Sequence, residues 1–189
     1  MPGAVSRSRR PRGTIRLAVA SSATGVHVVL VHPEIPPNTG SIARLCAATT
    51  VPLHLVRPLG FSLDDRYLKR AGLDYWPFVD LHVHESWGAF LTTEQPPALA
   101  CFSARATRTY LETPLAAGDA LYLVFGGETR CLEPAILAAH GAVLYAIPML
   151  TSYVRSLNLS NAVSIVVYEA LRQRGVFRPR AAPGGDDPG

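Results

Sequence analysis

Hydroxyl and amide side chains crowd the stretch just before the most regular helical pattern of the sequence. Ser156, Asn158, Ser160 and Asn161 lie within six residues, and each is a residue type that caps helix N-termini. One helix start needs far fewer such groups. Because the free N–H donors at a helix start also bind anionic and polar ligands, this surplus indicates a polar ligand site. A loop that merely caps its helix is the alternative.

Two more turns carry features suited to ligand binding. The apolar run 121–125 leads directly into Gly126 and Gly127, whose missing side chains let the backbone turn sharply and approach a ligand. A polar, basic segment follows the apolar run that ends at Phe102. With the turn after Ile147, these make three candidate ligand-binding loops.

The loops need a scaffold that brings them together. Apolar runs predict strands, and amphipathic or polar segments predict helices between them. The expected strands are 26–32, 53–56, 78–83, 98–102, 121–125 and 143–147, and the expected helices are 42–49, 64–72, 86–91, 133–140 and 159–171. This alternation indicates an α/β fold with a mostly parallel sheet and helices on both faces. Ligands bind such sheets at the carboxyl ends of the strands, so the three loops should meet there.

A proline-rich segment joins the first strand to the first helix. Three prolines, the last of them Pro37, are expected to keep the helix from starting earlier, because proline disrupts a helix interior. Asn38 or Thr39 is then the predicted cap. On this helix Arg44 points away from the apolar stripe.

Composition predicts one globular domain over residues 26–175. The chain has 189 residues, of which 48% are hydrophobic and 17% charged, enough for a sizeable core. Residues 1–25 hold five arginines and no acid, which predicts a disordered basic arm. An export signal, an organellar import signal and an over-long start are alternatives for this arm. The tail 176–189, rich in Gly, Pro and Asp, is also expected to be disordered.

Charge and cysteine content limit the classes of function that the sequence suggests. The net charge is +4, and all but one of the 18 basic residues are arginines, which is compatible with nucleic-acid binding. The three cysteines lack C-x-x-C spacing, which indicates a reducing compartment such as the cytoplasm and no structural metal. The histidines in or beside the strands are interpreted as core or edge residues. No apolar run reaches the length of about 20 residues that spans a membrane.

Motifs for dinucleotide binding, phosphate-loop hydrolysis and serine hydrolysis are absent from the sequence. Four segments instead carry a resemblance: Pro33–Cys46, Arg70–Tyr75, Phe125–Arg130, and Ile147–Met149 together with Leu157–Val163. They resemble the signature segments of the knotted SPOUT methyltransferases, in the branch that methylates the ribose 2′-hydroxyl of the wobble nucleotide (34) of certain leucine tRNAs. The similarity covers about residues 26–175, in order and with nearly the same spacing.

The resemblance implies a C-terminal deep trefoil knot, which sequence periodicity does not predict. It also implies S-adenosylmethionine bound in a bent shape among three loops, S-adenosylhomocysteine as the product, no metal, a tRNA substrate, and a homodimer with the active site near the subunit interface. Carried over by motif position, the cofactor residues are Phe102, Gly126, Glu128, Ile147, Ser156 and Leu157.

The resemblance also assigns residues to catalysis and RNA binding. Arg44 matches the arginine that activates the ribose hydroxyl, and Tyr168 matches a tyrosine near the active site. Arginine stays protonated in proteins, so we expect Arg44 to hold the substrate phosphate and polarise the hydroxyl, with the proton leaving late or to water. Packing is the alternative role for Tyr168. Asn38, Arg130 and Arg155 are the predicted RNA-binding residues.

Four departures separate this sequence from the family pattern. Cys131 replaces the usual second glycine of G-x-E-x-x-G, and Arg105-Ala106 replaces a Lys-Gly pair. The loop 149–156 is about one residue longer than usual, and the basic arm is extra. Two alternatives to the tRNA enzyme therefore stay open. One is methyl transfer to another RNA such as ribosomal RNA, and the other is a knotted RNA-binding protein without methyl transfer.

Overall fold

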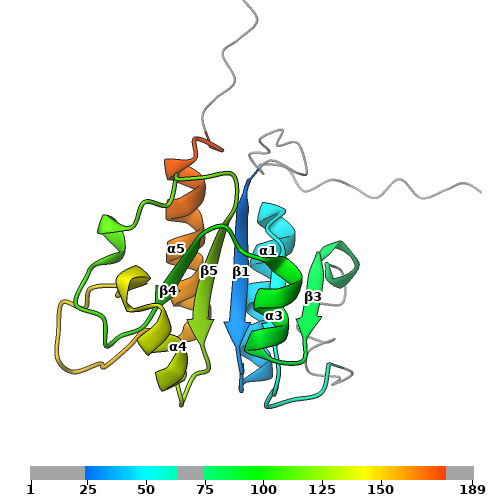
Figure 1. Cartoon of the computed structure of the whole chain (residues 1–189), viewed down its shortest axis with the longest axis horizontal. Helices are drawn as coiled ribbons and strands as arrows, with labels where there is room; N and C mark the ends of the chain where they lie inside the picture. Colours follow the sequence, from blue (N-terminus) through cyan, green and yellow to red (C-terminus); the bar gives the residue numbers. More distant parts are fainter. Residues whose placement is uncertain (1–23, 64–74, 178–189) are drawn as a thin grey trace, which may run out of the picture.

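The computed structural model describes residues 24–63 and 75–177. The predicted helix 64–72 lies outside these residues, as do almost all of the basic arm and of the tail. Figure 1 shows one layered α/β unit with its sheet in the middle. Among the described helices, none has the length and apolarity needed to cross a membrane.

The sheet has six strands, and all their pairings are parallel. The strands are β1 (Val26–Val31), β2 (Leu53–Val56), β3 (Leu81–His84), β4 (Leu99–Phe102), β5 (Leu121–Gly126) and β6 (Leu144–Tyr145), in the spatial order β3-β2-β1-β5-β4-β6. The central strands β1 and β5 are rich in buried valine and leucine, as expected for strands covered on both faces. The predicted α/β class and parallel sheet are confirmed.

Helices cover both faces of the sheet. Helices α1 (Pro36–Thr49) and α5 (Leu159–Gln173) pack on one face, and α3 (Trp87–Glu94) and α4 (Pro134–Ala139) on the other (Figure 1). Short 3-10 helices lie at Trp76–Phe78, Tyr110–Glu112 and Gly141–Val143. The regular helical pattern predicted over 159–171 is confirmed, because α5 buries an apolar stripe at helical spacing: Val163, Val166, Val167, Ala170 and Leu171.

Helix α1 begins earlier than the sequence predicts. It starts at Pro36, with Ile35 as its N-cap residue, so the prediction that Asn38 or Thr39 caps it is wrong. Pro36 and Pro37 occupy the first helical positions, where a missing N–H costs nothing and the proline φ angle already suits a helix. Asn38 and Thr39 are therefore in the first turn, and both are buried.

Two predicted strands are shorter than expected. Trp76–Phe78 forms a 3-10 turn, so the strand expected at 78–83 begins only at Leu81. The strand expected at 143–147 keeps two residues, because Ala146 instead exchanges backbone hydrogen bonds with Arg108 and Tyr110, both of 2.8 Å. The chain after β6 is thereby tied to the loop after β4, which matters for the site described next.

Candidate functional site

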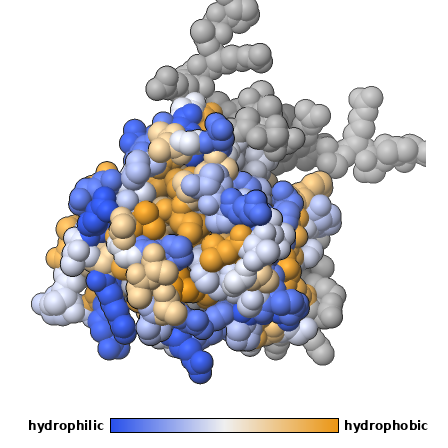
Figure 2. Space-filling model, in the orientation of Figure 1, coloured by the Kyte–Doolittle hydropathy of each residue, from blue (hydrophilic) through white to orange (hydrophobic). Residues whose placement is uncertain are grey.

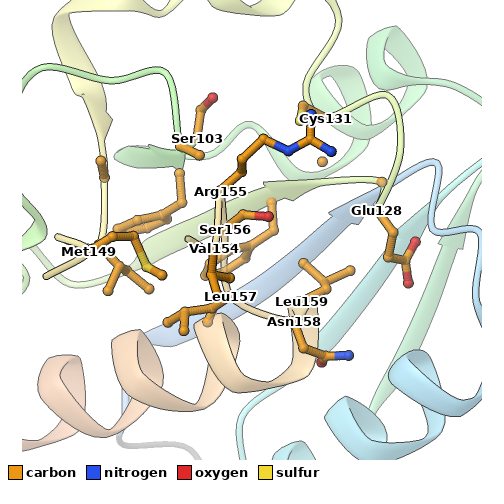
Figure 3. Close-up of a pocket in the computed structure, with 18 of the residues that line it drawn as sticks. Ser103, Glu128, Cys131, Met149, Val154, Arg155, Ser156, Leu157, Asn158 and Leu159 are labelled. Atoms are coloured by element: carbon orange, nitrogen blue, oxygen red, sulfur yellow. The ribbon is translucent and has the colours of Figure 1, made fainter. Parts of the chain in front are cut away.

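The loops after β4, β5 and β6 meet at one cavity of about 750 Å³. Its place at the carboxyl ends of these strands follows the rule for open α/β sheets, and the predicted convergence of the three turns is confirmed. Figure 3 shows side chains from all three loops around the hollow, among them Ser103, Cys131 and Ser156. The six residues assigned to cofactor binding by resemblance all line it: Phe102, Gly126, Glu128, Ile147, Ser156 and Leu157.

The cavity has an apolar base and a more polar rim. The rings of Phe102 and Phe125, from neighbouring strands, stack with centroids 4.9 Å apart and planes within 16°. Ile147, Met149 and Leu157 add further apolar lining. Figure 2 shows hydrophilic side chains along the edge where the strands end. Such a pocket suits a ligand that combines a flat base with polar groups.

The turn after β5 depends on its glycines. A Cβ at Gly126 would overlap the backbone of Cys131, and a Cβ at Gly127 would overlap the carbonyl oxygen of His32. The backbone N–H of Cys131 donates to the Gly127 oxygen at 3.0 Å, which closes the turn. Cys131 has a φ of 57°, in the left-handed region that favours glycine. The cysteine that departs from the family pattern is thus held in a backbone conformation suited to the usual glycine.

A polar network ties three distant segments together beside the cavity. The Glu128 carboxylate accepts hydrogen bonds from the backbone N–H groups of Glu34 (2.8 Å) and Ile35 (3.3 Å) and from the Asn38 side-chain amide (2.9 Å). The Asn38 oxygen accepts one from Asn158 at 3.0 Å. Glu128 therefore occupies the open N–H groups at the start of α1, where a negative charge is favourable.

Asn158 joins this network to the start of α5. Its side-chain oxygen accepts hydrogen bonds from the N–H (2.8 Å) and the hydroxyl (2.7 Å) of Ser160. Among the four capping residue types in this stretch, Asn158 is therefore the N-cap. Ser156 remains on the cavity lining, as the proposed surplus of polar groups requires.

The structure separates the predicted catalytic residues from the cavity lining. Arg44 is exposed on α1, with its guanidinium carbon 5.3 Å from the centre of the Tyr75 ring. Tyr168 is 51% exposed and stacks on Phe177 at 5.4 Å. Within the described chain, neither is among the residues that line the cavity.

The predicted RNA-binding residues divide in the same way. Asn38 and Arg155 line the cavity, Asn38 as a buried member of the network and Arg155 as an exposed residue of the rim. Arg130 is exposed on the turn after β5, outside the lining.

The lining residues that sequence reasoning did not assign to the site include Ser103, Met149 and Cys131. Ser103 follows β4 directly, is 8% exposed, and donates its backbone N–H to Tyr145 at 2.9 Å. Its position after a buried strand was the available signal. Burial raises the pKa values of Cys46 and Cys101 to about 12, so Cys131 is the accessible thiol.

Comparison with known proteins places this geometry in a family. The model of the SpoU rRNA methylase family matches residues 25–168, which contain every strand of the sheet and all three cavity loops. The chain belongs to the SpoU rRNA methylase family. This agrees with the resemblance stated from the sequence motifs.

Curated SpoU relatives match over nearly their whole length. The tRNA (cytidine(34)-2′-O)-methyltransferase of Saccharophagus degradans is 50% identical over 151 residues, which cover 79% of this chain and 96% of the relative. The protein of the same name from Escherichia coli K12 is 48% identical over 151 residues, covering 79% and 94%.

Solved structures share the fold of this chain. A structure described as giving insights into the 2-OH methylation of C/U34 on tRNA has a TM-score of 0.72 and 48% identity, and the match covers 80% of this chain and 97% of that one. The SpoU methyltransferase AviRb from Streptomyces viridochromogenes, in complex with AdoMet, has a TM-score of 0.67 at 23% identity, covering 79% and 60%. The second likeness concerns the fold alone.

Proposed function

We propose that this protein is a tRNA 2′-O-methyltransferase that transfers a methyl group from S-adenosylmethionine to the ribose 2′-hydroxyl of nucleotide 34. Its substrates in this proposal are leucine tRNAs, and it acts in the cytoplasm. The observation that carries the proposal is the identity of about half of all aligned positions with relatives of that name, over at least 94% of their length. The match to the family model, over residues 25–168, includes the cavity loops.

The cavity supports the cofactor assignment. Its volume of about 750 Å³ lies within the range of small-molecule and cofactor sites. In this assignment the aromatic and aliphatic lining, including Phe102, Ile147 and Leu157, contacts the adenine, and loop backbone groups near Gly126 and Ser156 bind its polar edges. The network around Glu128 and Asn38 holds two of the loops in register, so the binding shape exists before the ligand arrives.

The chemistry is an in-line displacement at a sulfonium methyl. A bond forms between the ribose oxygen and the methyl carbon while the carbon–sulfur bond breaks, and S-adenosylhomocysteine leaves. Arg44 holds a substrate phosphate and polarises the hydroxyl. Because a guanidinium keeps its proton, the hydroxyl proton goes to water. Positioning and charge complementarity supply most of the acceleration.

A second copy of the chain completes the site in this proposal. Arg44 and Tyr168 lie off the cavity lining of the single described chain, which supports their action near a subunit interface. Large apolar side chains are exposed on the loop after β6 (Leu150, Tyr153, Val154) and on α5 beside Tyr168. Exposed large apolar side chains favour association. Analytical ultracentrifugation should find a dimer, and a monomer that is fully active would contradict this part.

The deep trefoil knot is part of the same proposal. It is supported by the six-strand order and by the hydrogen bonds that bind the chain after β6 to the loop after β4. Stretching a single molecule from its two ends tests it. A knotted chain should extend less than its residue number allows, and full extension would contradict the knot.

The substrate test uses total tRNA and ribosomal RNA in parallel. The full-length protein is incubated with each RNA and isotopically labelled S-adenosylmethionine, and methylated nucleosides are mapped by mass spectrometry. The expected product is 2′-O-methylation at nucleotide 34 of leucine tRNAs. Methylation confined to ribosomal RNA would replace the tRNA assignment, and RNA binding without methyl transfer would identify a binding protein.

The tRNA lies over a basic surface in this proposal. Arg155 stands at the cavity rim and Arg130 on the neighbouring turn, and the net charge of +4 favours phosphate binding. Affinity for tRNA should therefore fall steeply as salt rises, and Arg130→Ala and Arg155→Ala should each flatten that slope. Unchanged slopes would remove both residues from the RNA surface.

A further inference from the structure

Four histidines gather on the face of the sheet that α3 and α4 cover. Their positions follow from strand register: His54 on β2 pairs with His82 on β3, and His84 lies two residues farther on the same side as His82. His27 on β1 reaches His54, with 3.1 Å between His27 Nδ1 and His54 Nε2. His54 is fully buried and His84 is 6% exposed. None of the four lines the cofactor cavity.

Three groups in this cluster converge as metal ligands do. The Nδ1 atom of His54, the Nε2 atom of His84 and a carboxylate oxygen of Glu94 form a triangle with sides of 3.1, 3.7 and 3.7 Å. The point in their plane that is equidistant from the three atoms lies about 2.0 Å from each, so an ion displaced slightly from this plane toward a fourth ligand stays within the zinc–nitrogen and zinc–carboxylate range of about 2.0–2.2 Å. The sides also bracket the edge of about 3.3 Å that a tetrahedral zinc site has.

Surrounding groups hold these ligands in the orientation that a metal needs. His54 can donate its Nε2 proton to His27, which leaves Nδ1 as a free lone pair aimed at the triangle. The Tyr122 hydroxyl donates to the other carboxylate oxygen of Glu94 at 3.4 Å, and its ring stacks on His27 with centroids 4.2 Å apart.

A plain hydrogen-bonded chain explains the cluster less well. It accounts for the 3.1 Å contact between His54 and His84, but the Glu94 oxygen lies 3.7 Å from both nitrogens, too far for a hydrogen bond. The Glu94 carboxylate is also largely buried, with only 17% of its side chain exposed. A cation between the three groups would compensate this charge.

We propose that His54, His84 and Glu94 bind one divalent transition-metal ion of the zinc type, with water as the fourth ligand. The ion ties the last residue of α3 to the neighbouring strands β2 and β3. It stabilises this side of the sheet, and water and metal reach it beside the partly exposed Glu94. The site is independent of methyl transfer and replaces the expectation that these histidines are only core or edge residues.

Metal titration of the full-length protein tests the proposal. Protein without a histidine tag, stripped with chelator, should bind one Zn²⁺ per chain in calorimetry, with a Kd below about 1 µM, and its melting temperature should rise on binding. Co²⁺ should give visible absorption bands of four-coordinate intensity. Absence of both the heat and the bands would overturn the site, and this arm needs no variant.

Variants then identify the ligands. His84→Gln and Glu94→Gln should each weaken Zn²⁺ binding by more than about tenfold. The control is His82→Gln, because His82 stacks on His54 with centroids 4.6 Å apart but is not a ligand. Its affinity should stay within about threefold of wild type. Wild-type affinity in both ligand variants, with folding verified by circular dichroism, would overturn the assignment.

Discussion

The cavity at the strand ends and the histidine cluster carry their polar groups on different kinds of structure. In the cavity, Ser156 and Arg155 are exposed loop residues, and neighbouring loops are held in place by the side chains of Glu128 and Asn38. In the cluster, His54 and His84 stand on strands and are buried. Loop groups adapt to a ligand that enters and leaves, whereas strand groups keep a fixed geometry suited to an ion that stays.

This contrast predicts different responses to substitution. Changes to the exposed loop residues of the cavity should alter activity or ligand affinity, while changes in the hydrogen-bonded network of Glu128, Asn38 and Asn158 should alter stability. The same distinction applies within one helix, since α1 carries exposed Arg44 and buried Asn38.

The largest effect is expected for Arg44→Ala. Loss of the group that we propose to hold the phosphate and polarise the hydroxyl should lower the rate of methyl transfer by about 100-fold or more. Cofactor affinity should stay unchanged, because Arg44 lies off the cavity lining. Single-turnover rates and calorimetry measure the two quantities.

Arg44→Lys is the matched variant for this prediction. It keeps the charge but loses the planar fork, so it should recover only part of the rate. Methyl transfer by Arg44→Ala at a near wild-type rate would remove Arg44 from catalysis.

Asn38→Ala should chiefly destabilise the fold. It removes the donor to Glu128 and the acceptor for Asn158 at a buried position, so the free energy of unfolding should fall by about 1–3 kcal/mol. Urea denaturation measures it. The control is Ser41→Ala on the same helix. The Ser41 hydroxyl donates to the exposed Pro37 oxygen, so its loss should change the free energy of unfolding by less than about 0.5 kcal/mol. Equal losses in the two variants would contradict the network.

Local patterns in the sequence predicted most of the scaffold. Buried apolar runs located the six strands, and the stripe of α5 was read correctly because its helical period is regular. The start of α1 was missed because prolines fit the first turn of a helix as well as the segment before it. The end of β6 was missed because Ala146 forms its backbone hydrogen bonds with Arg108 and Tyr110, which belong to a loop distant in the sequence.

The sequence predicted the three loops of the candidate site but not the histidine cluster. These loops follow from strand ends and glycines, which are local signals. The histidine cluster depends on register between β1, β2 and β3 and on the end of α3 reaching them. No spacing in the sequence contains that information. The position of Arg44 off the lining likewise depends on three-dimensional packing.

Alkylation of Cys131 tests whether the cavity takes the cofactor. Cys131 lines the cavity, whereas Cys46 and Cys101 are buried with pKa values raised to about 12. Iodoacetamide should therefore label Cys131 first, and saturating S-adenosylhomocysteine should slow that labelling by about tenfold or more. Mass spectrometry of peptides follows each site, with Cys131→Ser as the control for background labelling. Unprotected labelling with the ligand bound would place the cofactor elsewhere.

The smallest effect is expected for Ser156→Ala, which removes one exposed hydroxyl from the cavity lining. One neutral hydrogen bond contributes about 0.5–1.5 kcal/mol, so the Kd for S-adenosylmethionine should rise by about two- to tenfold. Stability should not change, because Asn158 and not Ser156 caps α5. Calorimetry and thermal melting measure the two effects together. If the melting temperature falls while the affinity for S-adenosylmethionine stays constant, Ser156 stabilises the fold and does not bind the ligand. The distinction between rim residues that bind the ligand and network residues that stabilise the fold would then be wrong for Ser156.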